Sequence, residues 1–223
     1  MAQHLLREID ILKKKILALG ATVESDVQKA VQSVQDRDVA MADEVINLDN
    51  AIDQAEVDLE EDCLKILALH QPVAIDLRFI VAVLKINSDL ERIGDLAVNI
   101  AERAKFLATR GQIMAPFDLY ELADKAQGMV RHSLDSLVNL DASLAREVCR
   151  TDDEVDELNR RAFESATAAI RVQPELADIL IAYLSVSRYL ERMADHATNV
   201  AEDVIYMIEG VIARHRPEAS QTS

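Results

Sequence analysis

The chain has 223 residues, a formal net charge of −16, 50% hydrophobic residues, five glycines, four prolines and no tryptophan. A chain of this length can bury a substantial core in one or two domains, and the low glycine and proline content favours long helices. The negative charge argues against nucleic-acid binding and against binding to anionic lipid surfaces, and it favours cations or basic protein surfaces as partners.

The first half of the chain contains three stretches whose apolar residues recur every three or four positions, which is the period of an amphipathic helix. They predict helices over about 4–36, 39–70 and 73–109. The polar residues 35–38 predict a turn, and Pro72 ends the second helix because proline cannot continue it. The third helix carries a regular apolar seam. Its members are Phe79, Val83, Ile86, Leu90, Ile93, Ala97 and Ile100.

The same order of elements repeats after residues 111–116, where the helical pattern breaks. Helices are predicted over about 117–139 and 142–171, and Pro174 ends the second of these. A sixth helix carries a seam in which each residue follows its counterpart by one hundred positions. Its members are Ile179, Tyr183, Val186, Leu190, Met193, Ala197 and Val200.

A period near one hundred residues with three helices per unit predicts an all-α protein of two tandem, pseudo-symmetric three-helix bundles. The first repeat covers residues 1–110 and the second covers residues 116–214. The polar residues 215–223 are expected to form a disordered tail. Short connections make successive helices antiparallel.

A twelve-residue motif recurs in the third and sixth helices, at residues 91–102 and 191–202. Its pattern is E-R-x-x-D-x-A-x-N-x-A-E, and seven of the twelve positions are identical in the two copies. The glutamate and the aspartate are four residues apart, so a helix places both carboxylates on one face. Two like charges at this spacing destabilise an isolated helix by about 0.2–0.5 kcal/mol, which suggests that another function compensates for the cost.

Each repeat contains a second acidic pair with the same spacing on its preceding helix. In the first repeat Asp49 and Asp53 accompany Glu91 and Asp95, and in the second repeat a matching set recurs. The members of that set are Asp152, Asp156, Glu191 and Asp195. The two pairs of a repeat lie almost equally far from the turn between their helices. Because the rise per residue is constant, they are expected at the same height on antiparallel neighbours.

These eight carboxylates are the candidate metal ligands. Their heptad positions flank the apolar seam, so any site would lie at the surface or in a shallow groove. Hard oxygen ligands without cysteine suit Mg²⁺, Ca²⁺, Mn²⁺ or iron better than a structural zinc site, although zinc is also a candidate ion. Asn99, Asn199, Glu102 and Glu202 continue the same stripe and could add oxygens. The alternative is that the acids form a solvated helix face.

Histidine, arginine and cysteine side chains near the acidic pairs or elsewhere in the helices are candidates for a role in binding. His196 follows Asp195 but points about a third of a turn away from it, which disfavours a ligand role. Arg92 and Arg192 are expected to pair with neighbouring acids rather than with a partner. Cys63 and Cys149 lack a CxxC spacing and are interpreted as buried, reduced thiols.

The sequence also bears on location. Its apolar runs are short, such as residues 80–84, and the first ten residues contain acids too early for a secretory signal. We therefore predict a cytoplasmic protein without direct membrane insertion. A homodimer is left open.

The chain resembles the PhoU family of bacterial phosphate-uptake regulators. The family motif is similar to ERIGD at residues 91–95 and ERMAD at residues 191–195, and QPVAIDLR at residues 71–78 looks like the family's turn. The resemblance covers nearly the whole chain. The second motif has Ala194 and His196 where the first has Gly94 and Leu96, and these differences leave its ligand set open.

This resemblance implies two three-helix bundles that bind metal ions through the acidic motifs. It also implies a negative regulator of the phosphate-starvation response, which connects the ATPase subunit of the phosphate ABC transporter with a sensor histidine kinase. A helical scaffold without a metal site is the main alternative. A metal-dependent enzyme is less favoured, because no histidine follows a glutamate by three residues, as a di-iron bundle would require.

Overall fold

Six long helices form in the order in which their apolar periods occur in the sequence. The structure is a computed structural model that describes residues 2–210. Its helices are α1 (Ala2–Asp36), α2 (Val39–His70), α3 (Ala74–Ala108), α4 (Leu119–Asn139), α5 (Ala142–Val172) and α6 (Ala177–Glu209), with a 3₁₀ turn at Pro174–Leu176. The described range contains no strand. The expected all-α architecture is confirmed, whereas the expected tail at 215–223 lies outside the described residues.

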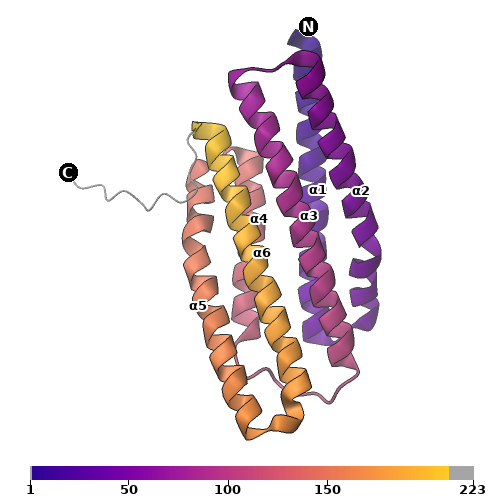
Figure 1. The fold of residues 1–223 in the computed structure, drawn as a ribbon, viewed down its shortest axis with the longest axis vertical. Coiled ribbons are helices and arrows are strands. Elements are labelled where there is room, and N and C mark those ends of the chain that lie inside the picture. The colour runs from indigo at the N-terminus through magenta and orange to yellow at the C-terminus, as the bar shows by residue number, and fades with distance from the viewer. Residues whose placement is uncertain (1, 211–223) are drawn as a thin grey trace, which may run out of the picture.

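The helices of each repeat pack as a three-helix bundle, and the two bundles lie side by side through α3 and α6 (Figure 1). The helices α2, α3, α6 and α5 follow one another across the molecule, with α1 and α4 behind them. Helix α1 also contacts α4. Short connections fix this arrangement, because a helix that turns back at once must pack against the one before it.

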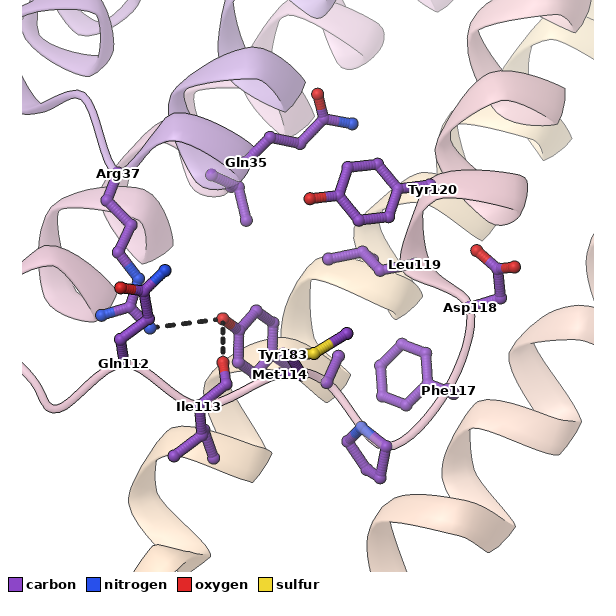
Figure 2. Close-up of a pocket in the computed structure, with 13 residues that line it drawn as sticks. Gln35, Arg37, Gln112, Ile113, Met114, Phe117, Asp118, Leu119, Tyr120 and Tyr183 are labelled. Atoms are coloured by element: carbon purple, nitrogen blue, oxygen red, sulfur yellow. Dashed lines mark hydrogen bonds between the residues drawn. The ribbon is translucent and has the colours of Figure 1, made fainter.

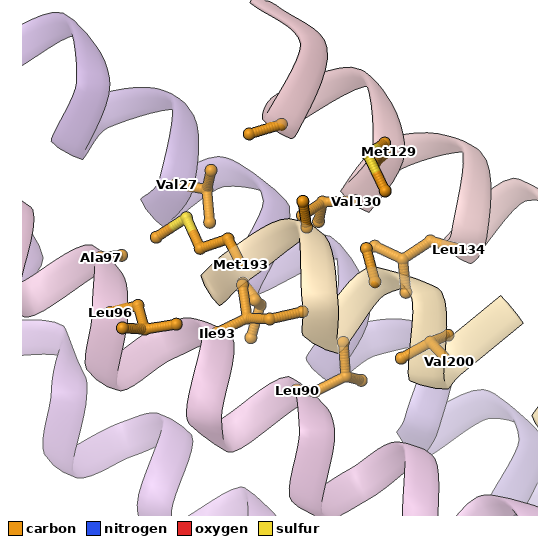
Figure 3. Close-up of a cluster of buried hydrophobic side chains, with 14 of the residues drawn as sticks. Val27, Leu90, Ile93, Leu96, Ala97, Met129, Val130, Leu134, Met193 and Val200 are labelled. Carbon is orange, nitrogen blue, oxygen red and sulfur yellow. The ribbon is translucent and has the colours of Figure 1, made fainter. Parts of the chain in front are cut away.

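One hydrophobic core runs through both bundles and receives side chains from all six helices. The seams predicted on α3 and α6 are buried along most of their length, and Ile93 and Met193 are completely buried near the contact between the two helices (Figure 3). Close packing of these seams holds the repeats together, because apolar surface buried between helices is the main favourable term in folding.

Helix α2 buries only part of its apolar pattern. Leu48 follows the three- and four-residue spacing of Val45 and Ile52, but 37% of it is exposed. Among the elements that the structure describes, helix α2 contacts only α1 and α3, and it lies at the edge of the molecule (Figure 1). A helix with neighbours on one side buries a narrow stripe, so the stripe keeps Val45 and Ile52 and leaves Leu48 outside.

The turns between the first two helices of each repeat have the same geometry. Arg37 and Leu140 both adopt left-handed backbone conformations, with φ of 55° and 52°. The following residues, Asp38 and Asp141, cap α2 and α5 by accepting hydrogen bonds from backbone N–H groups of the first helical turn. These caps satisfy donors that a helix leaves unpaired. The turns begin both helices at matching positions and so place the acidic pairs at matching heights.

Within the described part of the chain, no helix carries a stretch long and apolar enough to cross a bilayer. Both cysteines are free thiols, with Cys63 buried and Cys149 half-buried. Burial raises the pKa of Cys63 to about 12 and that of Cys149 to about 11. Neither side chain is therefore a thiolate near neutral pH.

Candidate functional site

The first acidic cluster lies between α2 and α3, where the sequence predicted it. Asp49, Asp53 and Asp95 each offer a carboxylate oxygen, and these three oxygens lie within 4.8 Å of one another. Asp49 and Asp95 are half-buried and Asp53 is exposed. The cluster thus lies at a partly exposed place between two helices, as the flanking heptad positions indicated.

Glu91 lies close enough to interact with this cluster, although it is not one of the three carboxylates that converge. Its pKa is raised by burial first and then by Asp95, and Asp53 adds to the effect, while Arg92 opposes it. The pKa of Asp49 is likewise raised by burial and then by Asp53 and Asp95. The carboxylates therefore repel one another in a partly dehydrated site, and a bound cation would relieve this repulsion.

The second acidic cluster lies between α5 and α6 and is electrostatically more strained. Burial first, and then Asp195 and Asp156, raises the pKa of Asp152 to about 6. The pKa of Glu191 is raised by burial, Asp195 and Asp156, and that of Asp195 by burial and Asp156. All four predicted residues thus act on one another. In the described range, however, only the first cluster has three carboxylate oxygens that all lie within 4.8 Å of one another.

A buried polar contact beside each cluster fixes the spacing of the two helices. The fully buried Asn87 donates a hydrogen bond from Nδ2 to the backbone oxygen of Glu56, at 2.8 Å. At the matching place in the second repeat, the buried Ser187 hydroxyl donates to Oδ1 of Asn159, at 2.7 Å. Each contact lies about one helical turn from an acidic pair, so it helps hold the carboxylates at their separation.

The donor set of the first cluster fits a hard cation. Oδ1 of Asp49 is buried and has no hydrogen-bond partner, and a buried acceptor without a partner is costly unless something else binds it. Carboxylate oxygens without sulfur or imidazole are the ligands that Mg²⁺, Ca²⁺ and Mn²⁺ prefer. The site contains no nucleophile adjacent to a base, so the arrangement is suited to binding an ion.

Sequence reasoning missed one carboxylate of the first cluster. The pKa of Glu56 is raised by burial, then by Glu60 and Asp53, so this side chain interacts electrostatically with the cluster. Its spacing of three residues from Asp53 puts it one turn along the same face of α2, which was the available signal. The second repeat has Asn159 at this place, and its oxygen is taken by Ser187. The clusters therefore differ in composition.

Three side chains beside the acidic clusters form hydrogen bonds or ion pairs of their own. His196 donates from Nδ1 to Asp89 Oδ1 at 2.8 Å, and Asn199 donates to the same oxygen at 3.2 Å. Both thus connect α6 with α3. The bond of Asn199 uses its amide nitrogen, so the expectation that its oxygen adds to a metal site stays a prediction. Arg92 lies 3.4 Å from Glu91 and 3.3 Å from Asp95, which confirms the expected pairing with neighbouring acids.

Comparisons with known proteins identify the family of the chain. A family model described as "PhoU domain" matches residues 16–104 and 119–204. A phosphate-specific transport system accessory protein PhoU homolog of Pseudomonas aeruginosa is 35% identical, over 96% of this chain and 89% of the relative. The corresponding homolog of Aquifex aeolicus is 37% identical, over 95% of this chain and 96% of the relative.

Two solved structures share the fold. The crystal structure of PhoU from Pseudomonas aeruginosa has a TM-score of 0.89 at 35% identity and covers 92% of this chain and 99% of its own. The phosphate transport system regulatory protein PhoU from Streptococcus pneumoniae has a TM-score of 0.82 at 27% identity, covering 93% and 98%. The likeness extends across both bundles and not one repeat alone.

Proposed function

The chain belongs to the PhoU family, and we propose that it is a cytoplasmic negative regulator of the phosphate-starvation response. In this role it links the ATPase subunit of a phosphate-specific ABC transporter to a sensor histidine kinase. Support comes from the relatives, which are named as accessory proteins of the phosphate-specific transport system. The chain acts by binding these partners and has no catalytic step of its own.

The proposal includes two metal centres, one in each repeat. The observation that carries it is the convergence of Asp49, Asp53 and Asp95 around a buried, unpartnered carboxylate oxygen. Glu91 completes the first set. The second set consists of Asp152, Asp156, Glu191 and Asp195. A hard cation bound there would neutralise the repulsion and join two helices of a bundle, so it would stiffen the face that a partner meets.

Metal binding can be tested by thermal unfolding of the purified protein with and without a divalent or ferric ion. A ligand that binds only the folded state stabilises it by about 2.7 kcal/mol at a hundredfold excess over Kd. The parent's melting temperature should therefore rise. The double variant Glu191→Gln, Asp195→Asn should keep roughly half of the rise, because the other cluster remains.

Adding Glu91→Gln and Asp95→Asn to that variant should remove most of the remaining response. A matched control replaces the exposed Asp124 and Asp135 of α4, which lie outside both clusters. Without metal, the cluster variants should be as stable as the parent or slightly more stable, since like-charge repulsion is removed. An equal metal response in the parent and the quadruple variant would show that the acids form a solvated face.

The partner assignment calls for a separate test in cells that contain the phosphate transporter. A tagged copy of the chain should co-purify with the transporter's ATPase subunit and with the sensor kinase when phosphate is plentiful. The quadruple cluster variant should recover less of both partners, and the α4 control should recover as much as the parent. Failure of the parent to recover either protein would refute the linkage but leave the metal result standing.

A further inference from the structure

The connection between the two repeats forms a pocket that the metal clusters do not share. It has a volume of about 510 Å³ and lies where residues 109–118 pass from α3 to α4 (Figure 2). This volume falls within the range of about 300–1,000 Å³ that is typical of small-molecule sites. Its walls are mainly apolar and aromatic and include Val34, Ile113, Met114, Phe117, Leu119 and Tyr120.

The polar side of the pocket is organised by Arg37. Its Nη1 donates to the backbone oxygens of Leu107 and Arg110, at 2.9 and 3.0 Å, and its Nη2 donates to the hydroxyl of Tyr183, at 3.4 Å. The Tyr183 hydroxyl in turn donates to the backbone oxygen of Ile113, at 3.1 Å. These contacts hold the guanidinium group against the connection between the repeats.

Within residues 2–210, the hydrogen-bond partners of Arg37 are all uncharged. Among the residues that the structure describes, no carboxylate lies within the 4.0 Å ion-pair distance of its guanidinium. Asp118 also lines the pocket, but its Oδ1 accepts a hydrogen bond from the backbone N–H of Glu121 at 2.9 Å. Burying a guanidinium costs less free energy when an anion pairs with it. Because the chain has a net charge of −16, a half-buried arginine without a carboxylate partner needs an explanation.

The second repeat shows that the fold does not require this arginine. Leu140 occupies the place of Arg37 in the turn between α4 and α5 and has the same left-handed backbone conformation. Val83 occupies the place of Tyr183 and is fully buried. The turn and the seam thus form equally well with apolar side chains. Arg37 and Tyr183 form the polar wall of this pocket, whereas the pocket beside Leu140 is lined by other polar residues, Asp10, Lys13 and Asp76.

The two sides of the pocket have different chemistry. Figure 2 shows Tyr120 and Phe117 on one side, with Arg37 and Gln112 on the other. Met114 is 90% exposed and Tyr120 is 60% exposed, so large apolar side chains surround an open entrance. Aromatic faces favour planar apolar groups, and a guanidinium favours an anionic oxygen.

We propose that this pocket binds a small organic anion with a planar, apolar body. The body lies against Phe117, Tyr120 and Met114, and the acidic head lies toward Arg37 and the Gln112 amide. Such a ligand would contact the end of α1, the connection between the repeats and the beginning of α4. It would thereby contact both repeats at a place that shares no residue with the metal clusters.

The proposal can be tested with anilinonaphthalene sulfonate, a fluorescent probe that has a planar apolar body and an anionic head. The parent protein should bind it at one saturable site. Phenylnaphthylamine has the same body without the sulfonate and should bind about tenfold more weakly, which is the effect of losing one charge-assisted hydrogen bond. Equal or tighter binding of the neutral probe would overturn the role of Arg37.

Substitutions of pocket-lining residues test whether the probe binds in this pocket. Tyr120→Ser and Met114→Gln change exposed side chains and should each raise the Kd by several fold without altering the melting temperature. Phe163→Ser on α5 is the matched control, because Phe163 is 63% exposed but lies outside this pocket. An unchanged Kd in both pocket variants, or an equal rise in the control, would refute the site.

Arg37→Leu introduces the residue found at the matching place of the second repeat. It should abolish the preference for the anionic probe while keeping most of the affinity for the neutral one. Should this variant prove unfolded by circular dichroism, the parent's preference between the two probes and the Tyr120 and Met114 variants still decide the matter. Tight binding of the anionic probe by Arg37→Leu would contradict the proposal.

Discussion

At the scale of single residues, the carboxylate clusters are places where folding opposes ionisation. Asp152 shows this most clearly, because burial and two neighbouring aspartates raise its pKa to about 6. Asp49 and Glu91 shift in the same direction, mainly through burial. Such groups lower the stability of the metal-free protein at neutral pH, and a cation would reverse the effect.

The direction of the resulting pH dependence follows from proton binding. The carboxyl of Asp152 has a pKa of about 6 when folded and about 3.9 when unfolded. Between these values the folded state binds more protons, so stability rises as the pH falls. In a chelating buffer, the free energy of unfolding should therefore increase from about pH 7 to about pH 5.

Asp152→Asn should remove this part of the pH dependence. At about pH 7 it should raise the free energy of unfolding by on the order of 1–2 kcal/mol, after allowing for solvent screening. Asp135→Asn provides the control, because Asp135 is an exposed aspartate of α4 that lies outside both clusters. Denaturant unfolding at both pH values measures the difference, and parallel pH profiles for the parent and Asp152→Asn would contradict the assigned repulsion.

At the scale of helices, three glycines within helical segments have different surroundings. A Cβ added at Gly94 in α3 would meet Ile52 at 3.4 Å, which is ordinary contact. One added at Gly20 in α1 would lie 2.7 Å from Cδ2 of Leu134, a buried residue of α4. One added at Gly128 in α4 would meet nothing within 4 Å. Gly20 therefore allows α1 and α4 to approach closely.

Alanine substitutions should reveal this difference in chemical denaturation. Gly94→Ala and Gly128→Ala should raise the free energy of unfolding by about 0.5–1 kcal/mol, since glycine is unfavourable within a helix. Gly20→Ala gains the same helical preference but must displace Leu134, so we expect a net loss of about 1 kcal/mol. If Gly20→Ala were as stabilising as Gly128→Ala, the close contact between α1 and α4 would be refuted.

At the scale of the whole molecule, the two repeats form one packed body. Besides the shared core, Lys85 of α3 donates to the buried Asp203 of α6 at 3.0 Å. Together with the contact of His196 with Asp89, this ion pair ties the third helices of the two repeats together. Buried polar contacts of this kind require specific partners, so they favour one alignment of α3 against α6.

The repeat, the helices and the acidic pairs all follow from local patterns in the amino-acid sequence. The apolar seams and the breaks at Pro72, Pro174 and residues 111–116 reflect local rules of helix formation, so they can be read without a structure. The equal distances of the acidic pairs from the turns predicted that Asp49 and Asp53 would meet Asp95, and the structure brings them together. Whether an ion binds there stays a prediction.

Which helix surfaces face one another depends on how the helices pack in three dimensions. Periodicity gives the apolar face of one helix but not the neighbour that covers it, and Leu48 is exposed because α2 lies at an edge. The contact of His196 with Asp89 joins residues of different repeats. The pocket beside Arg37 likewise depends on a turn, a connecting segment and Tyr183 of α6. Such contacts arise from packing between distant parts of the chain, which no local pattern encodes.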